Sequence, residues 1–440
     1  MITLKSILFF VVFWDIIYNH FQQTTGDNCM LYRFFKRIYR FFNTRVVFGG
    51  ADSGRMPLEE QKKYLMAFPD PKDDYERSFF KYKCFCEYCY YKRKWMLVFY
   101  NIGAALILPW VRLKLSRMPD LQPQKVDALY ENVPRLPNDD ILPDDVRRKY
   151  SHTADITQIN YEGIFLNQNA KQICQKLKKQ YFVHFYFRLI VMIKLAQFSS
   201  YIGKYQPGTI LFYSCEREYA GPLITLLCEL QGTKYEAYMH GDYLYSLCFA
   251  FQRYSMYYTW DEQYNKMFQS LRCSFPVTVY IPGKLQGIAE KLDDNECRYF
   301  ATYYFSDERK DSAEKIREAF DVFAKYGLRC KVRPHPRFSD MEMLRTVFKD
   351  YEIEDPKAYA LENSIRDTVY VIGLNTTVLS QAFFSGKTVV IDDVSMPENY
   401  RELAAKGYIM IRRQHLLLSD LVRNIESLKD SFDGTCLFMR

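Results

Sequence analysis

Short apolar runs alternate with helical patterns through the second half of the chain. The runs form two series, which we predict as strands at residues 209–214, 235–239, 256–259 and 277–281 and at residues 299–305, 328–332, 368–372 and 387–391. Apolar residues at three- and four-residue steps predict helices within residues 167–205 and at 220–231, 261–270 and 311–326. Short apolar strands alternating with helices are typical of a parallel sheet covered on both faces.

The pattern breaks between the two series at Pro282 and Gly283. We therefore predict an α/β fold with two Rossmann-like domains facing across a cleft, at residues 121–283 and 284–440. Residues 1–120 are expected to form a basic, aromatic-rich N-terminal region with a first strand and helices that can associate with a membrane. The Pro-rich, polar stretch at residues 118–145 is expected to be a linker or wrapping loop.

Basic residues gather near the front of this 440-residue chain, whose formal net charge is +8. Residues 28–51 hold five basic residues and no acid, and residues 81–117 hold eight basic residues against the single Glu87. A nucleic-acid-binding protein would be expected to spread its basic residues over its working domain. We therefore expect no nucleic-acid partner.

The first basic stretch has the pattern of an amphipathic helix. One face carries Leu31, Phe34, Phe35, Ile38, Phe41 and Phe42, and the other carries Arg33, Lys36, Arg37 and Arg40. Such a helix can lie in a membrane interface with its basic residues near anionic lipid. It can equally pack on the protein's own core with its basic face in solvent.

A second apolar run covers residues 95–111 and is broken only by Asn101 and Pro109. It is shorter than the roughly 20 residues of a membrane span, so we predict a buried strand and helix, or a re-entrant or interfacial segment. Residues 7–14 are also apolar, but no small-residue cleavage site follows them. We predict a buried first strand there, and a cytoplasmic protein that is either free or peripheral on the inner face of the cell membrane.

The twelve cysteines have no regular spacing. Cys84, Cys86 and Cys89 cluster, but no second pair of ligands lies at zinc-site spacing. We therefore expect reduced thiols, no metal and no cofactor. The sequence also lacks the glycine motifs of dinucleotide oxidoreductases and P-loop NTPases, the nucleophile elbow of hydrolases, and the D-x-D signature of metal-dependent sugar transfer.

Ligands of open α/β sheets bind at the carboxyl ends of the strands. Polar side chains follow four predicted strands, at residues 214–218, 240–242, 333–337 and 375–377. These four stretches are therefore the candidate site.

The stretch Arg333-Pro334-His335-Pro336-Arg337 is the most specific of them. Its prolines restrict the backbone on both sides of His335 and present the imidazole on a stiff loop. The guanidiniums of Arg333 and Arg337 can bind phosphate oxygens in a bidentate manner. His335 could then donate a hydrogen bond or a proton to a leaving nucleotide. A Pro-rich turn with incidental charges is the alternative.

The other three stretches are less specific. Asn375, Thr376 and Thr377 lie at a predicted helix start, where hydroxyl and backbone N–H groups can bind phosphate or simply cap the helix. His240 precedes Gly241 and could act as a general base near neutral pH. Glu216 and Glu218 are alternative bases, or they pair with Arg217 or are merely solvated.

At these residues the sequence resembles the bacterial GT-B transferases that carry a His-Pro motif. This group includes polysialyltransferases, lipooligosaccharide sialyltransferases, capsule Kdo transferases and the CDP-glycerol glycerophosphotransferases. His335-Pro336 matches the His-Pro motif, Asn375-Thr376-Thr377 is similar to the downstream Ser-Ser/Thr motif, and Met239-His240-Gly241 is similar to the upstream His-Gly motif. Order and spacing agree across roughly residues 205–395. The pair of carboxylates followed by glycine that sialyltransferases carry is missing, and Asn375 replaces the first Ser.

The resemblance implies two Rossmann-like domains, with the acceptor bound by residues 121–283 and the nucleotide donor by residues 284–440. It also implies an inverting, metal-independent transfer of a sialic acid- or Kdo-like sugar from a CMP- or CDP-linked donor to a cell-surface polysaccharide or lipid-linked glycan. His335 would assist the leaving phosphate, and Thr376 and Thr377 would bind it. A polyol-phosphate transferase using CDP-glycerol or CDP-ribitol, and a non-catalytic GT-B scaffold or membrane adaptor, are the alternatives.

Overall fold

We describe the protein from a computed structural model. It covers residues 56–91, 94–117, 119–130, 150, 152–155, 164–213, 219–239, 241–281, 297–306, 309–336 and 339–426. The described residues divide into two compact units. The first runs to Met239 and continues from Tyr245 to Val279, and the second holds residues 241–244 and everything from Tyr280 onward.

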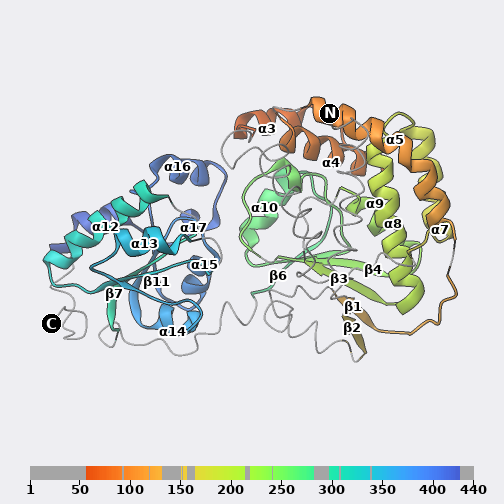
Figure 1. Cartoon of the computed structure of the whole chain (residues 1–440). Helices are drawn as coiled ribbons and strands as arrows, with labels where there is room; N and C mark the ends of the chain where they lie inside the picture. The colour runs from red at the N-terminus through yellow and green to blue at the C-terminus, as the bar shows by residue number, and fades with distance from the viewer. Residues whose placement is uncertain are drawn as a thin grey trace. The chain divides into compact units, whose positions relative to one another are not determined.

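A six-stranded parallel sheet lies at the centre of the first unit, in the order β2-β1-β3-β4-β5-β6. Its strands are β1 (Ala128–Tyr130), β2 (Thr153–Asp155), β3 (Thr209–Tyr213), β4 (Lys234–Tyr238), β5 (Met256–Thr259) and β6 (Val277–Val279). The helices of the same unit are α3 (Leu58–Met66), α4 (Asp74–Cys89), α5 (Trp95–Leu115), α7 (Gln168–Gln180), α8 (Phe185–Tyr205), α9 (Gly221–Glu229), the short η3 (Leu247–Phe249) and α10 (Glu262–Ser270) (Figure 1).

The N-terminal helices α3, α4 and α5 belong to this first unit. Helix α4 packs on α9 and η3, and α5 packs on α8. The buried Lys81 on α4 donates a hydrogen bond from Nζ to the carbonyl of Cys248 at 2.7 Å, and Ser78 Oγ donates to the carbonyl of Tyr219 at 2.7 Å. These contacts tie the helices at residues 56–115 to the later half of the first unit.

Helix α8 connects α5 to the first sheet. Phe187, Val191, Leu195 and Phe198 on it are among the buried residues of the unit. The ring of Phe198 lies 5.3 Å from that of Phe212 on β3, between ring centroids. α8 is therefore an internal helix, with the sheet on one side and α5 on another.

The second unit has a parallel sheet of its own, in the order β12-β11-β10-β7-β8-β9. Its strands are β7 (Tyr299–Tyr304), β8 (Cys330–Arg333), β9 (Glu352–Ile353), β10 (Thr368–Gly373), β11 (Thr388–Ile391) and β12 (Leu416–Leu417). Its helices are α12 (Lys310–Lys325), α13 (Met341–Val347), α14 (Leu361–Arg366), α15 (Thr377–Phe384), α16 (Pro397–Ala405), α17 (Ile409–Arg412) and α18 (Leu418–Arg423) (Figure 1).

Burial explains why these segments form strands and helices. Every residue of β7 and of β10 is buried, as expected for central strands of a sheet covered on both faces. Helix α12 turns Ile316, Phe320 and Phe323 into the core and leaves charged residues on its other face.

The predicted α/β fold class, with two Rossmann-like parallel sheets, is confirmed. The strands and helices predicted from residue 209 onward lie within two residues of the observed bounds. The prediction of a loop at 118–145 is wrong at β1, a short strand that pairs with β2 and β3. The run at 95–111 holds no strand, because all of it lies within the single helix α5. Pro109 lies inside this helix, at an exposed position. The strand predicted at 7–14 and the amphipathic helix predicted at 28–51 lie outside the described residues.

Candidate functional site

The strand order of the second unit identifies its ligand-binding edge. Along the chain, β7, β8 and β9 are added in one direction, and β10, β11 and β12 are then added on the other side of β7. The direction of winding therefore reverses between β7 and β10. Ligands of doubly wound sheets bind outside the carboxyl ends of the strands at such a reversal. The turns after β7 and β10 are thus the expected site.

The turn after β10 leads directly into helix α15. Gly373 ends the strand, and a Cβ at this position would lie only 3.2 Å from Thr376 Cγ2 and 3.4 Å from the carbonyl oxygen of Tyr304. Thr376 is the N-cap of α15, and its Oγ1 accepts a hydrogen bond from the N–H of Val378 at 3.4 Å. The first N–H groups of α15 therefore lie at the carboxyl edge of the sheet, where the helix dipole favours an anion.

Ser306 joins the ends of β7 and β10. It follows β7, and its Oγ donates a hydrogen bond to the carbonyl of Asn375 at 3.1 Å. The side chains of Asn375 and Thr377 are exposed. Sequence reasoning missed Ser306, although the rule that selected the other stretches, a polar residue just after a predicted strand, would have found it.

His335 lies on the loop after β8, the strand that neighbours β7 on its other side. It is half-buried, and its N–H donates to Ser339 Oγ at 2.7 Å, while the N–H of Ser339 donates back to the His335 carbonyl at 3.4 Å. Pro336 is exposed. Neighbouring strands lie about 4.8 Å apart, so the ends of β8 and β10, on either side of β7, are about 10 Å apart.

Arg333 makes structural contacts instead of facing a ligand. Its Nη1 forms a buried ion pair with Glu354, which also pairs with Lys331 Nζ, and its Nη2 donates to the carbonyl of Tyr359 at 2.9 Å. A phosphate would have to displace these partners. The geometry therefore gives the prediction that Arg333 binds phosphate no support.

A segment that follows β4 in the chain is grouped with the second unit. Ser380, fully buried on α15, donates from Oγ toward both carboxylate oxygens of Asp242, at 3.0 and 2.8 Å. The segment is thereby fixed to the helix whose first turn forms the candidate anion site. A Cβ on Gly241 would meet no atom within 4 Å, so the space beside this residue is open.

The carboxylates after β11 accept hydrogen bonds from other residues of the second unit. Asp392 is fully buried and accepts hydrogen bonds from the Tyr303 hydroxyl at 2.8 Å and from the N–H of Ser395 at 2.8 Å. Asp393 accepts from the hydroxyl of Ser419 at 2.6 Å. Both side chains hold the turns that support the sheet edge.

Four of the predicted site residues lie outside the described residues, namely Glu216, Glu218, His240 and Arg337. In the part of the chain that the structure describes, no group of three His, Cys, Asp or Glu side chains could hold a metal ion. The nine cysteines of that part are free thiols, and burial raises the pKa of Cys84 to about 12.

No protein-family model matches the sequence, and no curated protein matches it. Solved structures do match the chain. A UDP-N-acetylglucosamine 2-epimerase from Rickettsia bellii is 10% identical over 70% of this chain and 98% of its own, with a TM-score of 0.36. A UDP-GlcNAc 2-epimerase from Methanocaldococcus jannaschii is 12% identical over 72% and 96%, with a TM-score of 0.40. The glycosyltransferase SnogD from Streptomyces nogalater is 11% identical over 70% and 100%, with a TM-score of 0.32.

Proposed function

We propose that the chain is a glycosyltransferase of the GT-B type, and that its second unit binds a nucleotide-activated sugar. One observation carries this proposal. At the reversal of the strand order, the N-terminus of α15, the Ser306 hydroxyl and the loop of His335 come from three neighbouring strands and open on the same edge of the sheet. This arrangement suits a phosphate-linked ligand.

In this proposal the chain's own residues neutralise the leaving nucleotide. The first N–H groups of α15 and the hydroxyls of Thr376 and Thr377 bind the phosphate. His335 donates a hydrogen bond or a proton to the phosphate oxygen as the bond to the sugar breaks. In this proposal these groups stabilise the negative charge that develops on the leaving phosphate, and the transfer is metal-independent.

A general base removes the proton of the acceptor hydroxyl as that oxygen attacks the sugar. The candidates from the sequence are His240, Glu216 and Glu218. A single displacement of this kind inverts the anomeric configuration. From the His-Pro motif we propose a CMP- or CDP-linked donor with a sialic acid- or Kdo-like sugar, and a polysaccharide or lipid-linked glycan as acceptor.

Nucleotide binding to the full chain tests the donor site. We expect CMP or CDP, but not GDP, to raise the melting temperature. A nucleotide at 100 times its Kd stabilises the folded state by about 2.7 kcal/mol, which corresponds to about 5–10 °C for a unit of this size. Replacing Thr376 and Thr377 together by Ala should weaken binding about tenfold. Thr346→Ala, at a hydroxyl on the exposed face of α13, is the matched control and should bind normally. Stabilisation by no nucleotide would refute the proposal.

Turnover tests the role of His335. We expect His335→Ala to lose most of the nucleotide release from a CMP-sugar donor while it still binds CMP, and His335→Gln to show whether a hydrogen bond without a proton is enough. His152→Ala, at an exposed histidine of the first unit, is the control. Sugar transfer and polyol-phosphate transfer both release CMP, but only the second adds phosphorus to the acceptor. Unchanged turnover in His335→Ala would mean that another group assists the leaving phosphate.

A further inference from the structure

Helix α5 is apolar on both of its faces. Its inner face, which includes Tyr100, Ala104 and Leu108, is buried, and the helix packs on α8. Its outer face carries six large apolar side chains that are each more than half exposed: Trp95, Val98, Ile102, Leu106, Trp110 and Leu113. At about 100° per residue these six fall within an arc of about 120°. α12 by contrast turns charged residues outward.

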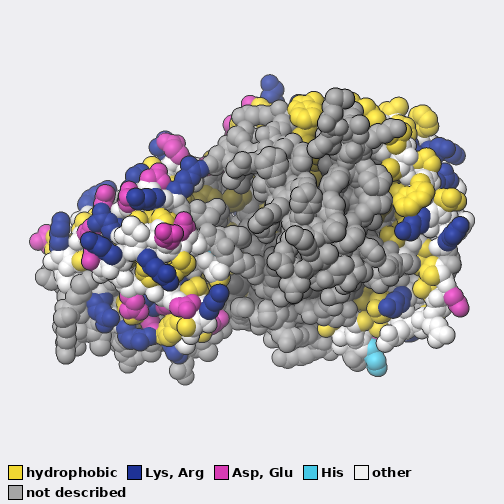
Figure 2. Space-filling model, viewed as in Figure 1, with side chains coloured by type: hydrophobic (Ala, Val, Ile, Leu, Met, Phe, Trp, Pro, Cys, Tyr) yellow, Lys and Arg dark blue, Asp and Glu magenta, His cyan; other side chains and the backbone are white. Residues whose placement is uncertain are grey.

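The outer face of α5 continues onto the turn between α7 and α8. Phe182 and Val183 in this turn are 59% and 60% exposed. Asn101 holds the turn against α5, because its Nδ2 donates to the carbonyl of Val183 at 2.8 Å and its Oδ1 accepts from the N–H of Tyr186 at 3.1 Å. Figure 2 shows hydrophobic side chains gathered where Figure 1 places α5, with Lys and Arg beside them. We call these eight exposed residues the α5 face.

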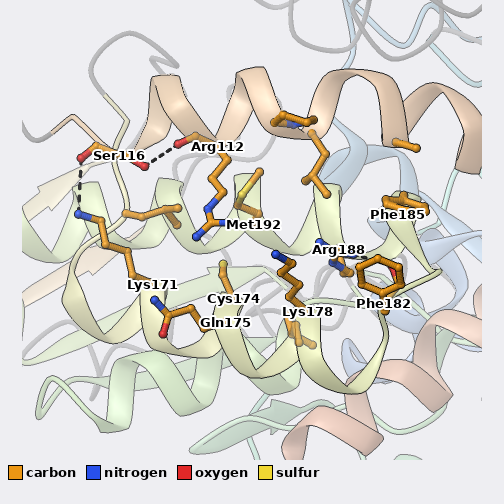
Figure 3. Close-up of a pocket in the computed structure, with 15 residues that line it drawn as sticks. Arg112, Ser116, Lys171, Cys174, Gln175, Lys178, Phe182, Phe185, Arg188 and Met192 are labelled. Carbon is orange, nitrogen blue, oxygen red and sulfur yellow. Dashed lines mark hydrogen bonds between the residues drawn. The ribbon is translucent and has the colours of Figure 1, made fainter.

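A groove of about 540 Å³ runs beside the α5 face, between α5, α7 and α8. Much of its lining is apolar, with Leu108, Leu166, Leu177, Phe185 and Met192 among the residues. Its charged residues are all basic: Arg112 from α5, Lys171 and Lys178 from α7, and Arg188 from α8. Figure 3 shows the side chains of Arg112 and Lys178 extending into the space between their helices.

The cations of the groove have no carboxylate partner within the part of the chain that the structure describes. Lys171 Nζ donates to the carbonyl of Ser116 at 3.5 Å, and Arg188 Nη1 donates to the carbonyl of Phe182 at 2.6 Å. Burial lowers the pKa of Arg188, and the neighbouring guanidinium of Arg112 lowers it further. An anion between these side chains would relieve that repulsion.

We propose that the α5 face lies in the interface of an anionic membrane and that the groove takes the phosphate headgroup of one lipid together with the first part of its acyl chain. The groove supplies positive charge and an apolar lining side by side, which is what such an amphiphile requires. This proposal does not depend on the proposed glycosyl transfer.

The packing of α5 determines how it meets the membrane. By length and composition α5 is the one helix in the described residues that could cross a bilayer. Its inner face, however, rests on α8, which itself packs against the first sheet through contacts such as Phe198 with Phe212. A spanning α5 would carry this sheet into the hydrocarbon. The helix therefore lies parallel to the membrane, with Trp95 and Trp110 about 22 Å apart along its axis.

Vesicle sedimentation of the full chain tests the α5 face. We expect binding to phosphatidylcholine vesicles that contain phosphatidylglycerol, and weaker binding to phosphatidylcholine alone. Leu106→Gln with Trp110→Gln should weaken binding to both at least about tenfold, since two large side chains lose their burial in lipid. Leu230→Gln, at an exposed leucine on a different helix end, is the matched control and should bind as the wild type.

Charge variants test the groove. Arg112→Gln and Lys178→Gln should each weaken binding about fivefold on anionic vesicles only, which corresponds to about 1 kcal/mol per cation. Gln175→Glu, which puts an acid in the groove, should weaken binding to anionic vesicles and to soluble dodecyl phosphate. Gln172→Glu, an exposed position of the same helix outside the groove lining, should change neither.

Four outcomes would overturn the proposal. If the wild type binds no vesicles, or the α5-face variants bind unchanged, the face is not a membrane surface. If those variants instead change the oligomeric state in size-exclusion chromatography, a second copy of the chain covers the face. If the wild type resists extraction from vesicles by carbonate, α5 spans the bilayer.

Discussion

Glu354→Gln should destabilise the second unit strongly. Glu354 forms ion pairs with both Lys331 and Arg333, and the side chains of Glu354, Lys331 and Arg333 are only 5%, 1% and 8% exposed. The substitution keeps the volume of the side chain but removes the carboxylate that pairs with both buried cations. Breaking a buried ion pair by removing one partner costs about 3–5 kcal/mol.

Lys331→Met is the informative comparison. It removes one of the two cations, so the pair of Arg333 and Glu354 remains balanced. The lost contacts include the position of Lys331 Nζ over the Tyr299 ring, at 4.3 Å from its centroid. Because an apolar side chain can replace a buried charge at little cost, we expect a loss below about 1 kcal/mol.

Urea unfolding followed by circular dichroism measures both variants. With an m-value of about 2 kcal/mol per M, Glu354→Gln should lower the midpoint of the second unit by about 1.5–2.5 M and Lys331→Met by less than about 0.5 M. The described tryptophans, Trp95, Trp110 and Trp260, all belong to the first unit, so their fluorescence serves as an internal control. Equal losses in the two variants would refute the argument from charge balance.

Two further changes test the second unit. Gly373→Ala should lower the free energy of unfolding by about 1–2 kcal/mol, because the new Cβ would lie 3.2 Å from Thr376 Cγ2. The same variant should weaken nucleotide binding. Gly221→Ala, whose new Cβ would have no atom within 4 Å, is the control and should leave the urea midpoint unchanged. Burial would raise the pKa of Asp367, but hydrogen bonds from Tyr359 and Arg298 outweigh it and lower that pKa. The stability that Asp367 contributes is therefore complete above about pH 4 and is lost as the pH falls through the lowered value. The difference in urea midpoint between wild type and Asp367→Asn should therefore be smaller at pH 3 than at pH 7. An equal difference at the two pH values would contradict this.

Residue pattern alone predicted the central strands. β7 and β10 are mostly apolar runs because both faces of the sheet are covered, so their own sequence predicts them. The short strands β1 and β9 were not predicted, since two or three residues have no pattern of their own and are fixed by pairing with neighbours. In α5, apolar residues on both faces hid the helical period that separates a helix from a strand.

The candidate site was predicted as a set of chain positions, and contacts then changed the roles of its members. Thr376 follows β10 as expected and caps α15. Arg333 looked available because the sequence places it beside His335, whereas its partner Glu354 is 21 residues further on and is brought near only by the pairing of β8 with β9. Local pattern finds the edge of a sheet, but a buried partner on another strand is set by the tertiary fold.

The bond from Lys81 to the Cys248 carbonyl has a consequence for synthesis of the chain on the ribosome. Its two ends are 167 residues apart, which takes about 8–33 s to translate at 5–20 residues per second. During that interval α4 and α5 have emerged, but the residues that bury their inner faces have not all followed. The strands of the second sheet, by contrast, all lie within residues 299–417. The first unit therefore begins to emerge first, yet its N-terminal helices wait longer for their partners than any strand of the second sheet does.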